Sequence, residues 1–148
     1  MFYYKSMKAI LLARLDATAQ APYPYPETSV PAGFPSPAQD YRAVSIDLND
    51  ILIKDKAATY ILRVSGHSMV DAGISDGDEI IVDRSLRPRP GNIVVAALNG
   101  EFTVKRFHID QAGVGWLYPE NPQYSPLQIN EESDFTIFGV VTRCLHHV

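Results

Sequence analysis

The segment 93–107 reads IVVAALNGEFTVKRF and contains the strongest fold signal in the chain. Its apolar runs 93–98 and 102–107 flank Asn99-Gly100, a dipeptide in which both residues accept a positive φ. Such a dipeptide between two apolar runs is typical of a tight β-hairpin. We therefore expect residues 93–98 and 102–107 to pair as antiparallel strands.

The rest of the C-terminal part repeats this pattern of short apolar runs bounded by turn residues. No stretch after residue 40 has a helical period longer than two turns. The sequence Asp76-Gly77-Asp78 indicates another tight turn. The sequence thus predicts a mainly β fold of short antiparallel strands, at residues 44–48, 59–64, 79–82, 93–98, 102–107, 115–118 and 135–142.

The first forty residues have a different composition. Six of the eleven prolines fall within residues 21–39. Because proline lacks the N–H and fixes φ, this stretch is predicted to be extended rather than a helix or a central strand. Residues 5–15 are expected to form a short helix, marginal by itself. The predicted organisation is an extended N-terminal arm over residues 1–40 and one β-rich domain over residues 41–148.

Composition restricts the function. The net charge of −4 argues against strong direct binding of nucleic acid, which needs a basic surface. The single cysteine, Cys144, excludes a disulfide framework and a Cys-based zinc site, so we expect a reduced, cytoplasmic protein with no metal and no cofactor. The apolar run 9–13 is too short to span a membrane. His146 and His147 are expected to be a frayed tail rather than a metal site.

Ser68 lies in a polar turn, residues 65–69 (SGHSM), that follows a predicted strand. Backbone N–H groups in such a turn can converge on one point, as an oxyanion site requires. A nucleophilic serine needs a base, and a lysine serves only if burial lowers its pKa from about 10.4. Lys105 is the lysine in an apolar setting, and His108 is a second candidate base. The residues alone leave open a Ser68–Lys105 dyad and a plain polar turn beside a surface lysine.

The order and spacing of several motifs resemble those of the UmuD proteins. These are the self-cleaving subunits of the bacterial SOS mutagenesis system, in a wider family of Ser–Lys peptidases that includes LexA and the phage repressors. The resemblance runs from about residue 32 to about residue 142. Its motifs are residues 32–41 (AGFPSPAQDY), 65–69 (SGHSM), 77–78 (GD) and 100–106 (GEFTVKR), with shorter matches at 46–49, 59–60, 124–126 and 138–141.

The resemblance implies a role for each matching residue. Ser68 is similar to the nucleophile of the family and Lys105 to its general base. The main-chain N–H groups of His67 and Ser68 are implied to form the oxyanion site. Ala32 and Gly33 resemble the junction at which these proteins cut themselves. His67 stands where an aspartate is common, and because its backbone acts, we expect little effect on catalysis.

The resemblance also implies partners. In UmuD-like proteins a RecA filament on single-stranded DNA stimulates the cleavage. The trimmed protein, a homodimer, then joins a UmuC-like Y-family DNA polymerase that copies past lesions. The arm is too short, and too rich in proline, for the helix-turn-helix domain of a LexA-type repressor, which favours the UmuD branch.

Two other hypotheses for the function are compatible with the sequence. A signal-peptidase-like enzyme would use the same Ser–Lys chemistry on other proteins, but such enzymes are membrane anchored and no anchor is found. A non-catalytic interaction module would not need both Ser68 and Lys105 intact, and a repressor-like regulator of the LexA family would need the helix-turn-helix domain for which the arm is too short. Self-cleavage at one bond, cutting of added proteins, or no cutting at all distinguishes the three.

Overall fold

The computed structural model describes residues 6–14, 22–26, 43–48, 52–132 and 134–148. Contacts divide the chain into two compact units, and one of them is Asp16–Lys56. Within that unit β2 (Pro22–Pro26) pairs antiparallel with β3 (Ala43–Asp47). Both strands of a two-stranded sheet are edge strands, which is the setting that tolerates the prolines of β2. The expected extended backbone is therefore found at residues 22–26, whereas 27–42 lie outside the described residues.

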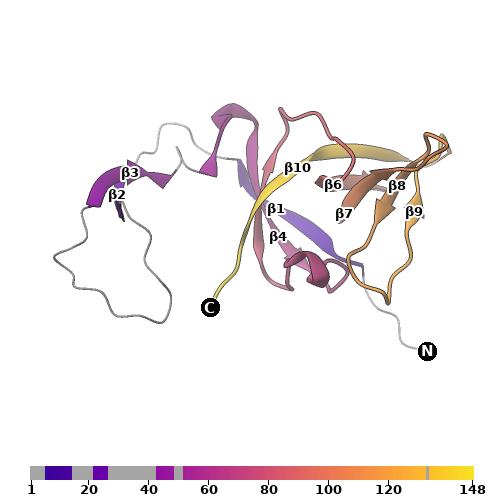
Figure 1. Cartoon of the computed structure of the whole chain (residues 1–148), viewed down its shortest axis with the longest axis horizontal. Coiled ribbons are helices and arrows are strands. Elements are labelled where there is room, and N and C mark those ends of the chain that lie inside the picture. The colour runs from indigo at the N-terminus through magenta and orange to yellow at the C-terminus, as the bar shows by residue number, and fades with distance from the viewer. Residues whose placement is uncertain (1–5, 15–21, 27–42, 49–51, 133) are drawn as a thin grey trace. The chain divides into compact units, whose positions relative to one another are not determined.

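The other unit joins the N-terminal segment to Ala57–Val148. Its antiparallel sheet has eight strands in the order β1-β4-β5-β10-β6-β7-β8-β9, and a further pairing of β1 with β7 closes six of them into a ring (Figure 1). Two 3₁₀ turns, η2 (Lys56–Ala58) and η3 (Val70–Ala72), accompany the strands. The strands are β1 (Lys8–Arg14), β4 (Thr59–Ser65), β5 (Glu79–Asp83), β6 (Ile93–Leu98), β7 (Glu101–Ile109), β8 (Gly115–Tyr118), β9 (Leu127–Gln128) and β10 (Phe135–Leu145).

The predicted hairpin is confirmed. β6 and β7 pair antiparallel from Ile93↔Arg106 to Leu98↔Glu101. The connecting residues Asn99 and Gly100 have φ values of 51° and 81°, the left-handed region that this turn requires. The mainly β fold and each of the other predicted strands are also confirmed, with boundaries shifted by a few residues.

The expected helix over residues 5–15 is wrong. Residues 8–14 form strand β1, which pairs with β4 from Lys8↔Ser65 to Arg14↔Tyr60 and meets β7 at Lys8↔Thr103. The guanidinium of Arg14 also donates to the carbonyl of Ala57 at 2.7 Å. The backbone of this segment pairs with β4 and β7. Such tertiary pairing overrides the local helix propensity of the segment. The two compact units therefore have other boundaries than the predicted arm and domain, which divide at residue 40. That residues 1–40 act as a cleavable arm remains a prediction.

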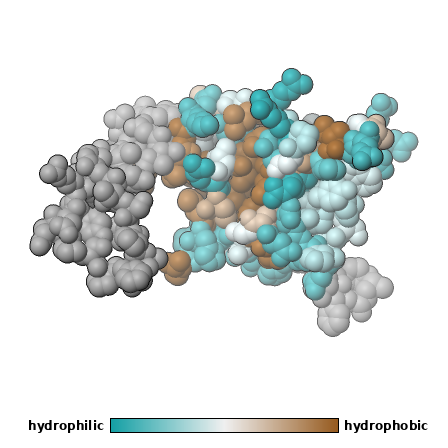
Figure 2. Space-filling view, viewed as in Figure 1, coloured by the Kyte–Doolittle hydropathy of each residue, from teal (hydrophilic) through white to brown (hydrophobic). Residues whose placement is uncertain are grey.

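The hydrophobic core fills the inside of this ring. Its main cluster combines Leu62 and Val64 from β4 with Val82, Val95 and Val104, all nearly inaccessible to solvent. Figure 2 shows a band of hydrophobic surface over the region where β1, β4 and β10 lie close together in Figure 1. The core cluster also includes a residue of the turn that follows β4, so the core extends beneath that turn.

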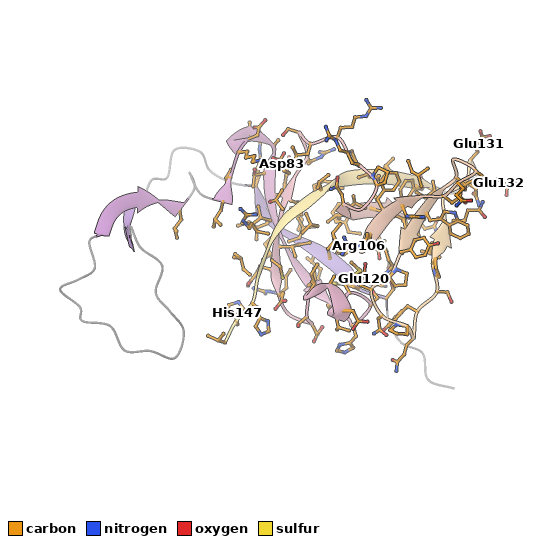
Figure 3. The ribbon with its side chains drawn as sticks, viewed as in Figure 1. Asp83, Arg106, Glu120, Glu131, Glu132 and His147 are labelled. Carbon is orange, nitrogen blue, oxygen red and sulfur yellow. The ribbon has the colours of Figure 1, made fainter. Side chains whose placement is uncertain are left out.

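The C-terminal tail is attached to β5, so the expectation that it frays is wrong. His146 Nδ1 lies 2.6 Å from Asp78 Oδ1, and His147 Nε2 lies 2.8 Å from Glu79 Oε2 (His147 is labelled in Figure 3). Across the described part of the chain, no three His, Cys, Asp or Glu side chains cluster as metal ligands would. The same part contains no helix with the length and apolar character needed to cross a bilayer.

Candidate active site

Ser68 lies at the bottom of the turn that follows β4, and its side chain is fully buried. The chain leaves β4 through Gly66, whose φ of 102° suits glycine because it has no Cβ. The Gly66 N–H donates to Asp76 Oδ1 at 2.8 Å, which ties this turn to the Asp76-Gly77 turn. The predicted sharp turn is therefore present, and it points the serine hydroxyl inward.

Lys105 lies on β7 at the point where the neighbouring strand changes. Thr103 pairs with β1, whereas Arg106 pairs with Tyr118 of β8. The Lys105 side chain is only 2% exposed, and its Nζ donates to Ser68 Oγ at 2.9 Å. The structure therefore brings together the two side chains that the sequence singled out.

Burial changes the proton affinity of Lys105. It lowers the pKa of the amine from 10.5 to about 8, because the charged form loses its hydration inside the protein. At pH 7 roughly one such amine in ten is neutral. The neutral amine has a lone pair that can accept a proton, so Lys105 has the environment of a general base.

His108 is not brought to the serine. Its exposed ring packs edge-on against Tyr118, with ring centroids 5.1 Å apart. Three residues along a strand from Lys105, its side chain belongs to the opposite face. The structure therefore excludes His108 as the alternative base in this conformation.

The carbonyl groups of the turn are held by the loop after β8. Asn121 Nδ2 donates to the His67 carbonyl at 2.8 Å, and the Glu120 N–H donates to the Ser68 carbonyl at 2.7 Å. In a trans peptide the C=O and the next N–H point in opposite directions, so Asn121 also fixes the direction of the Ser68 N–H. Within the described residues, the N–H groups of His67 and Ser68 have no hydrogen-bond partner. They are available as the oxyanion donors that the resemblance implies.

The loop is in turn fixed to the strand of the lysine. Arg106 forms an ion pair with Glu120, and the two side chains lie close together in Figure 3. Arg106 also donates to the Gly91 carbonyl at 2.6 Å. The residue beside Lys105 thus anchors the loop that holds Ser68. Sequence reasoning missed both Asn121 and Glu120, because more than fifty residues separate them from the serine turn and no motif connects them.

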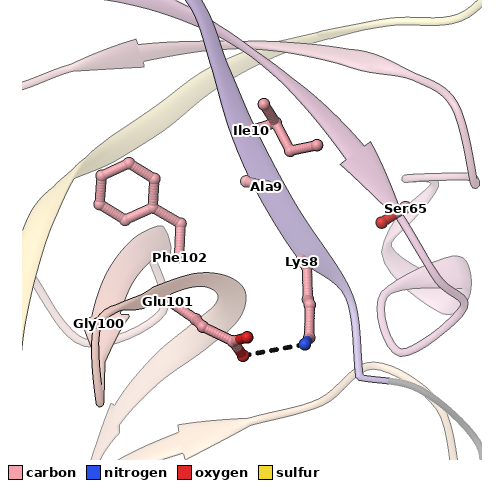
Figure 4. Close-up of a pocket in the computed structure, with 7 residues that line it drawn as sticks. All are labelled: Lys8, Ala9, Ile10, Ser65, Gly100, Glu101 and Phe102. Carbon is pink, nitrogen blue, oxygen red and sulfur yellow. Dashed lines mark ion pairs between the residues drawn. The ribbon is translucent and has the colours of Figure 1, made fainter.

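The segment before β1 covers the site. The Met7 N–H donates to Ser68 Oγ at 2.8 Å, and Lys105 Nζ donates to Ser6 Oγ. Thr103 Oγ1 donates to the Met7 carbonyl at 2.9 Å. Figure 4 shows how β1 continues from this point between Ser65 and the β6–β7 turn, with the Lys8–Glu101 ion pair of 2.9 Å beside it. These contacts were not predicted, and Ala32 and Gly33 of the expected cleavage site lie outside the described residues.

Comparison with known proteins defines the class. Residues 24–142 match the model of the Peptidase S24-like family, so the chain belongs to that family of self-cleaving serine peptidases. The protein SamA of Salmonella typhimurium is 41% identical over 93% of this chain and 94% of its own length. The protein MucA of Escherichia coli is 39% identical over 94% of each chain. The LexA repressor of Acidithiobacillus ferrooxidans is 45% identical over 78% of this chain but only 57% of its own length.

The lengths covered separate two branches of that family. SamA and MucA match along almost their whole length, whereas a large part of the LexA repressor has no counterpart in this chain. The predicted resemblance to the UmuD proteins is therefore confirmed, and the chain is UmuD-like.

Proposed function

We propose that this chain cuts itself between Ala32 and Gly33, with Ser68 as the nucleophile and Lys105 as its general base. The observation that carries the proposal is the 2.9 Å contact between Lys105 Nζ and Ser68 Oγ, with both side chains buried. A serine hydroxyl becomes a good nucleophile when an adjacent base takes its proton. The lowered pKa of Lys105 provides such a base near neutral pH.

The chemistry proceeds in two steps. Ser68 Oγ attacks the carbonyl carbon of Ala32 while its proton passes to the neutral amine of Lys105. The N–H groups of His67 and Ser68 stabilise the oxyanion. The C–N bond to Gly33 then breaks, and Lys105 returns the proton to the Gly33 nitrogen. Water, deprotonated by Lys105, hydrolyses the ester and regenerates Ser68.

The proposed partners are those that the resemblance to the UmuD proteins implies. The proposal includes stimulation by a RecA filament on single-stranded DNA, which would favour the conformation in which the cleavage segment reaches Ser68. RecA need supply no catalytic group, because the base and the nucleophile are both in this chain. The trimmed product, residues 33–148, would act as a homodimer with a UmuC-like Y-family polymerase during synthesis past lesions.

Intact-mass measurement tests the proposal. Purified protein is incubated with RecA, single-stranded DNA and a nucleotide, and the expected product begins at Gly33. Ser68→Ala and Lys105→Ala should each lower the rate at least about a thousandfold, and the double variant should lose no more, because the two residues act as one unit. Lys54→Ala, at an exposed lysine, is the matched control and should cleave normally.

Each other outcome has a clear meaning. A product that begins at another residue refutes the cleavage site. Normal cleavage by Lys105→Ala refutes the dyad, and cleavage by Ser68→Ala indicates a contaminating protease. No product under any condition supports a non-catalytic interaction module.

A further inference from the structure

The gap between β4 and β7 is a binding site for an extended strand, and the chain fills it with its own residues. β4 ends at Ser65, directly before the serine turn, and β7 supplies Thr103 and Val104 on the other side. The Met7 carbonyl accepts two hydrogen bonds from β7, one from Thr103 Oγ1 at 2.9 Å and one from the Val104 N–H at 3.3 Å. The Met7 side chain is completely buried. An extended segment is therefore bound here by its backbone and one apolar anchor.

The bound segment lies at the nucleophile in a pose that cannot be cut. The Met7 N–H donates to Ser68 Oγ, so the oxygen lies near the plane of the Ser6–Met7 peptide. Attack on a peptide needs the oxygen above the carbonyl carbon, out of that plane. The same segment also engages the base, because Lys105 Nζ donates to Ser6 Oγ.

From this geometry we propose that residues 6–14 are a built-in competitive inhibitor of the strand site between β4 and β7. The inference rests on the proposed self-cleavage and adds its control. Residues 32–33 and residues 6–7 need the same hydroxyl and the same amine, so only one of the two segments occupies the site at a time. Seventeen residues lie between Arg14 and Ala32, and a chain of that length spans up to roughly 60 Å. One chain can therefore exchange the two segments.

The burial of β1 agrees with an exchangeable strand. Only Met7 and Ala9 point into the core, at 0% and 7% exposure. Ile10 is 66% exposed, and Leu11 and Leu12 are nearly half exposed. Release of the segment therefore removes only two side chains from the core.

A reversible crosslink tests the inference without disturbing the contacts at Ser68. Ile10 and Arg63 face each other across β1 and β4, and both are exposed. Directly opposed residues of antiparallel strands have the Cα separation that a disulfide needs. The Ile10→Cys/Arg63→Cys variant should cleave normally when reduced and at least tenfold more slowly when oxidised. Each single variant has no thiol opposite the new cysteine and is the matched control, so it should not respond to oxidation; the native Cys144 is present in all of these variants.

A second variant opens the site. Met7→Asp places a charge at the buried anchor and should speed release of the product beginning at Gly33 at least fivefold, whereas Ile10→Asp on the exposed face should change it less than twofold. A synthetic peptide of residues 6–14 should slow the Met7→Asp protein again, and the same peptide carrying aspartate at the Met7 position should not.

Failure of this inference is distinguishable from failure of the proposed function. Equal rates in the oxidised and reduced double variant, with the product still beginning at Gly33, overturn the inhibitor and leave the self-cleavage standing. A product beginning at Met7 also overturns it, because the segment would then be a substrate. No cleavage in the reduced variant, in the wild type and in Met7→Asp overturns the proposed function, and the inhibitor with it.

Discussion

Strands β1 and β7 are paired with each other in the same sheet, but they are held there by different means. In β7 three consecutive side chains, Thr103, Val104 and Lys105, are buried, so both faces of the strand are covered. In β1 the backbone pairs with β4 along the whole strand, yet Ala9 is its only buried residue. Backbone pairing is therefore no measure of how firmly a strand is anchored.

The energies differ accordingly. Complete burial of one side chain such as Met7 contributes about 1.5–3 kcal/mol. The other contacts of β1 are the small side chain of Ala9, backbone hydrogen bonds, and exposed polar contacts of Lys8 and Arg14, which water can replace. β7 is fixed by core packing on one face and by the serine turn on the other. The strand with the base is thus permanent, whereas the strand that covers it is exchangeable.

Among the effects expected from the buried residues of β7, the largest is the change in cleavage rate with pH. The burial that lowers the pKa of Lys105 to about 8 leaves most of the amine charged at pH 6. The rate of spontaneous cleavage should rise about tenfold per pH unit and level off near pH 8, a hundredfold gain in all. Product formation measured from pH 6 to 10, with Ser68→Ala as the blank, tests this. A rate that does not change with pH contradicts lysine as the base.

The burial of the Lys105 amine should also make the free energy of unfolding depend on pH. Lys105 has a pKa of about 8 in the folded chain and an ordinary value of 10.5 when unfolded, so its burial destabilises the fold by about 3 kcal/mol below pH 8. Between pH 8 and 10.5 the unfolded chain binds more protons, and this destabilisation disappears as the pH rises. Lys105→Met should therefore raise the free energy of unfolding by up to about 3 kcal/mol at pH 7, and by much less at pH 10.5.

Urea unfolding at both pH values measures this difference. Lys54→Met, at an exposed lysine, is the control and should change neither value. A gain that is equal at pH 7 and pH 10.5 would mean that the methionine packs better and that the charge of Lys105 is not the cause.

The same contrast explains what the sequence could predict. The β6–β7 hairpin follows from Asn99-Gly100 and two apolar runs, all local signals. Lys105 is a candidate from the sequence because a lysine inside an apolar run is hard to keep hydrated. The pairing of the base with Ser68 across 37 residues needed the family resemblance as well.

β1 could not be predicted in this way. The stretch KAILLAR consists mostly of residues with good helix propensity, and it is a strand because β4 and β7 supply partners distant in sequence. The contact of Asn121 with the His67 carbonyl is equally non-local, and an asparagine in a turn has no signal of its own. Ser6 and Met7 reach the site only because β1 places them there.

Paired truncations measure the difference in anchoring directly. Val104→Ala on β7 removes two methyl groups from the core and should lower the free energy of unfolding by about 2 kcal/mol. Leu12→Ala on β1, at a side chain 43% exposed, should change it by less than about 0.5 kcal/mol. Equal losses in urea unfolding would show that β1 is a fixed part of the core, and would argue against exchange.

The C-terminal tail is held in a third way, by contacts with the buried carboxylate of Asp78. Asp78 accepts hydrogen bonds from the Ser75 N–H at 2.8 Å and from the Cys144 thiol at 3.2 Å, and it contacts His146. Burial is the largest influence and by itself raises the pKa of Asp78, but these hydrogen bonds together outweigh it and lower the pKa. Burial, and then the hydrogen bond to Asp78, raise the pKa of Cys144 to about 12, so its thiol stays protonated and donates.

A smaller loss of stability than that of Val104→Ala is expected from Asp78→Asn. The lowered pKa means that the carboxylate stabilises the fold above its ordinary value of 3.8, and that this contribution is lost as the pH falls through the folded value. The variant keeps one oxygen for Ser75 but lacks the charge, so it should lose about 1 kcal/mol at pH 7 and progressively less toward pH 2. Glu132→Gln, at an exposed carboxylate labelled in Figure 3, should change neither value. A loss that stays constant from pH 7 to pH 2 in thermal unfolding would mean that packing around position 78, and not its charge, anchors the tail.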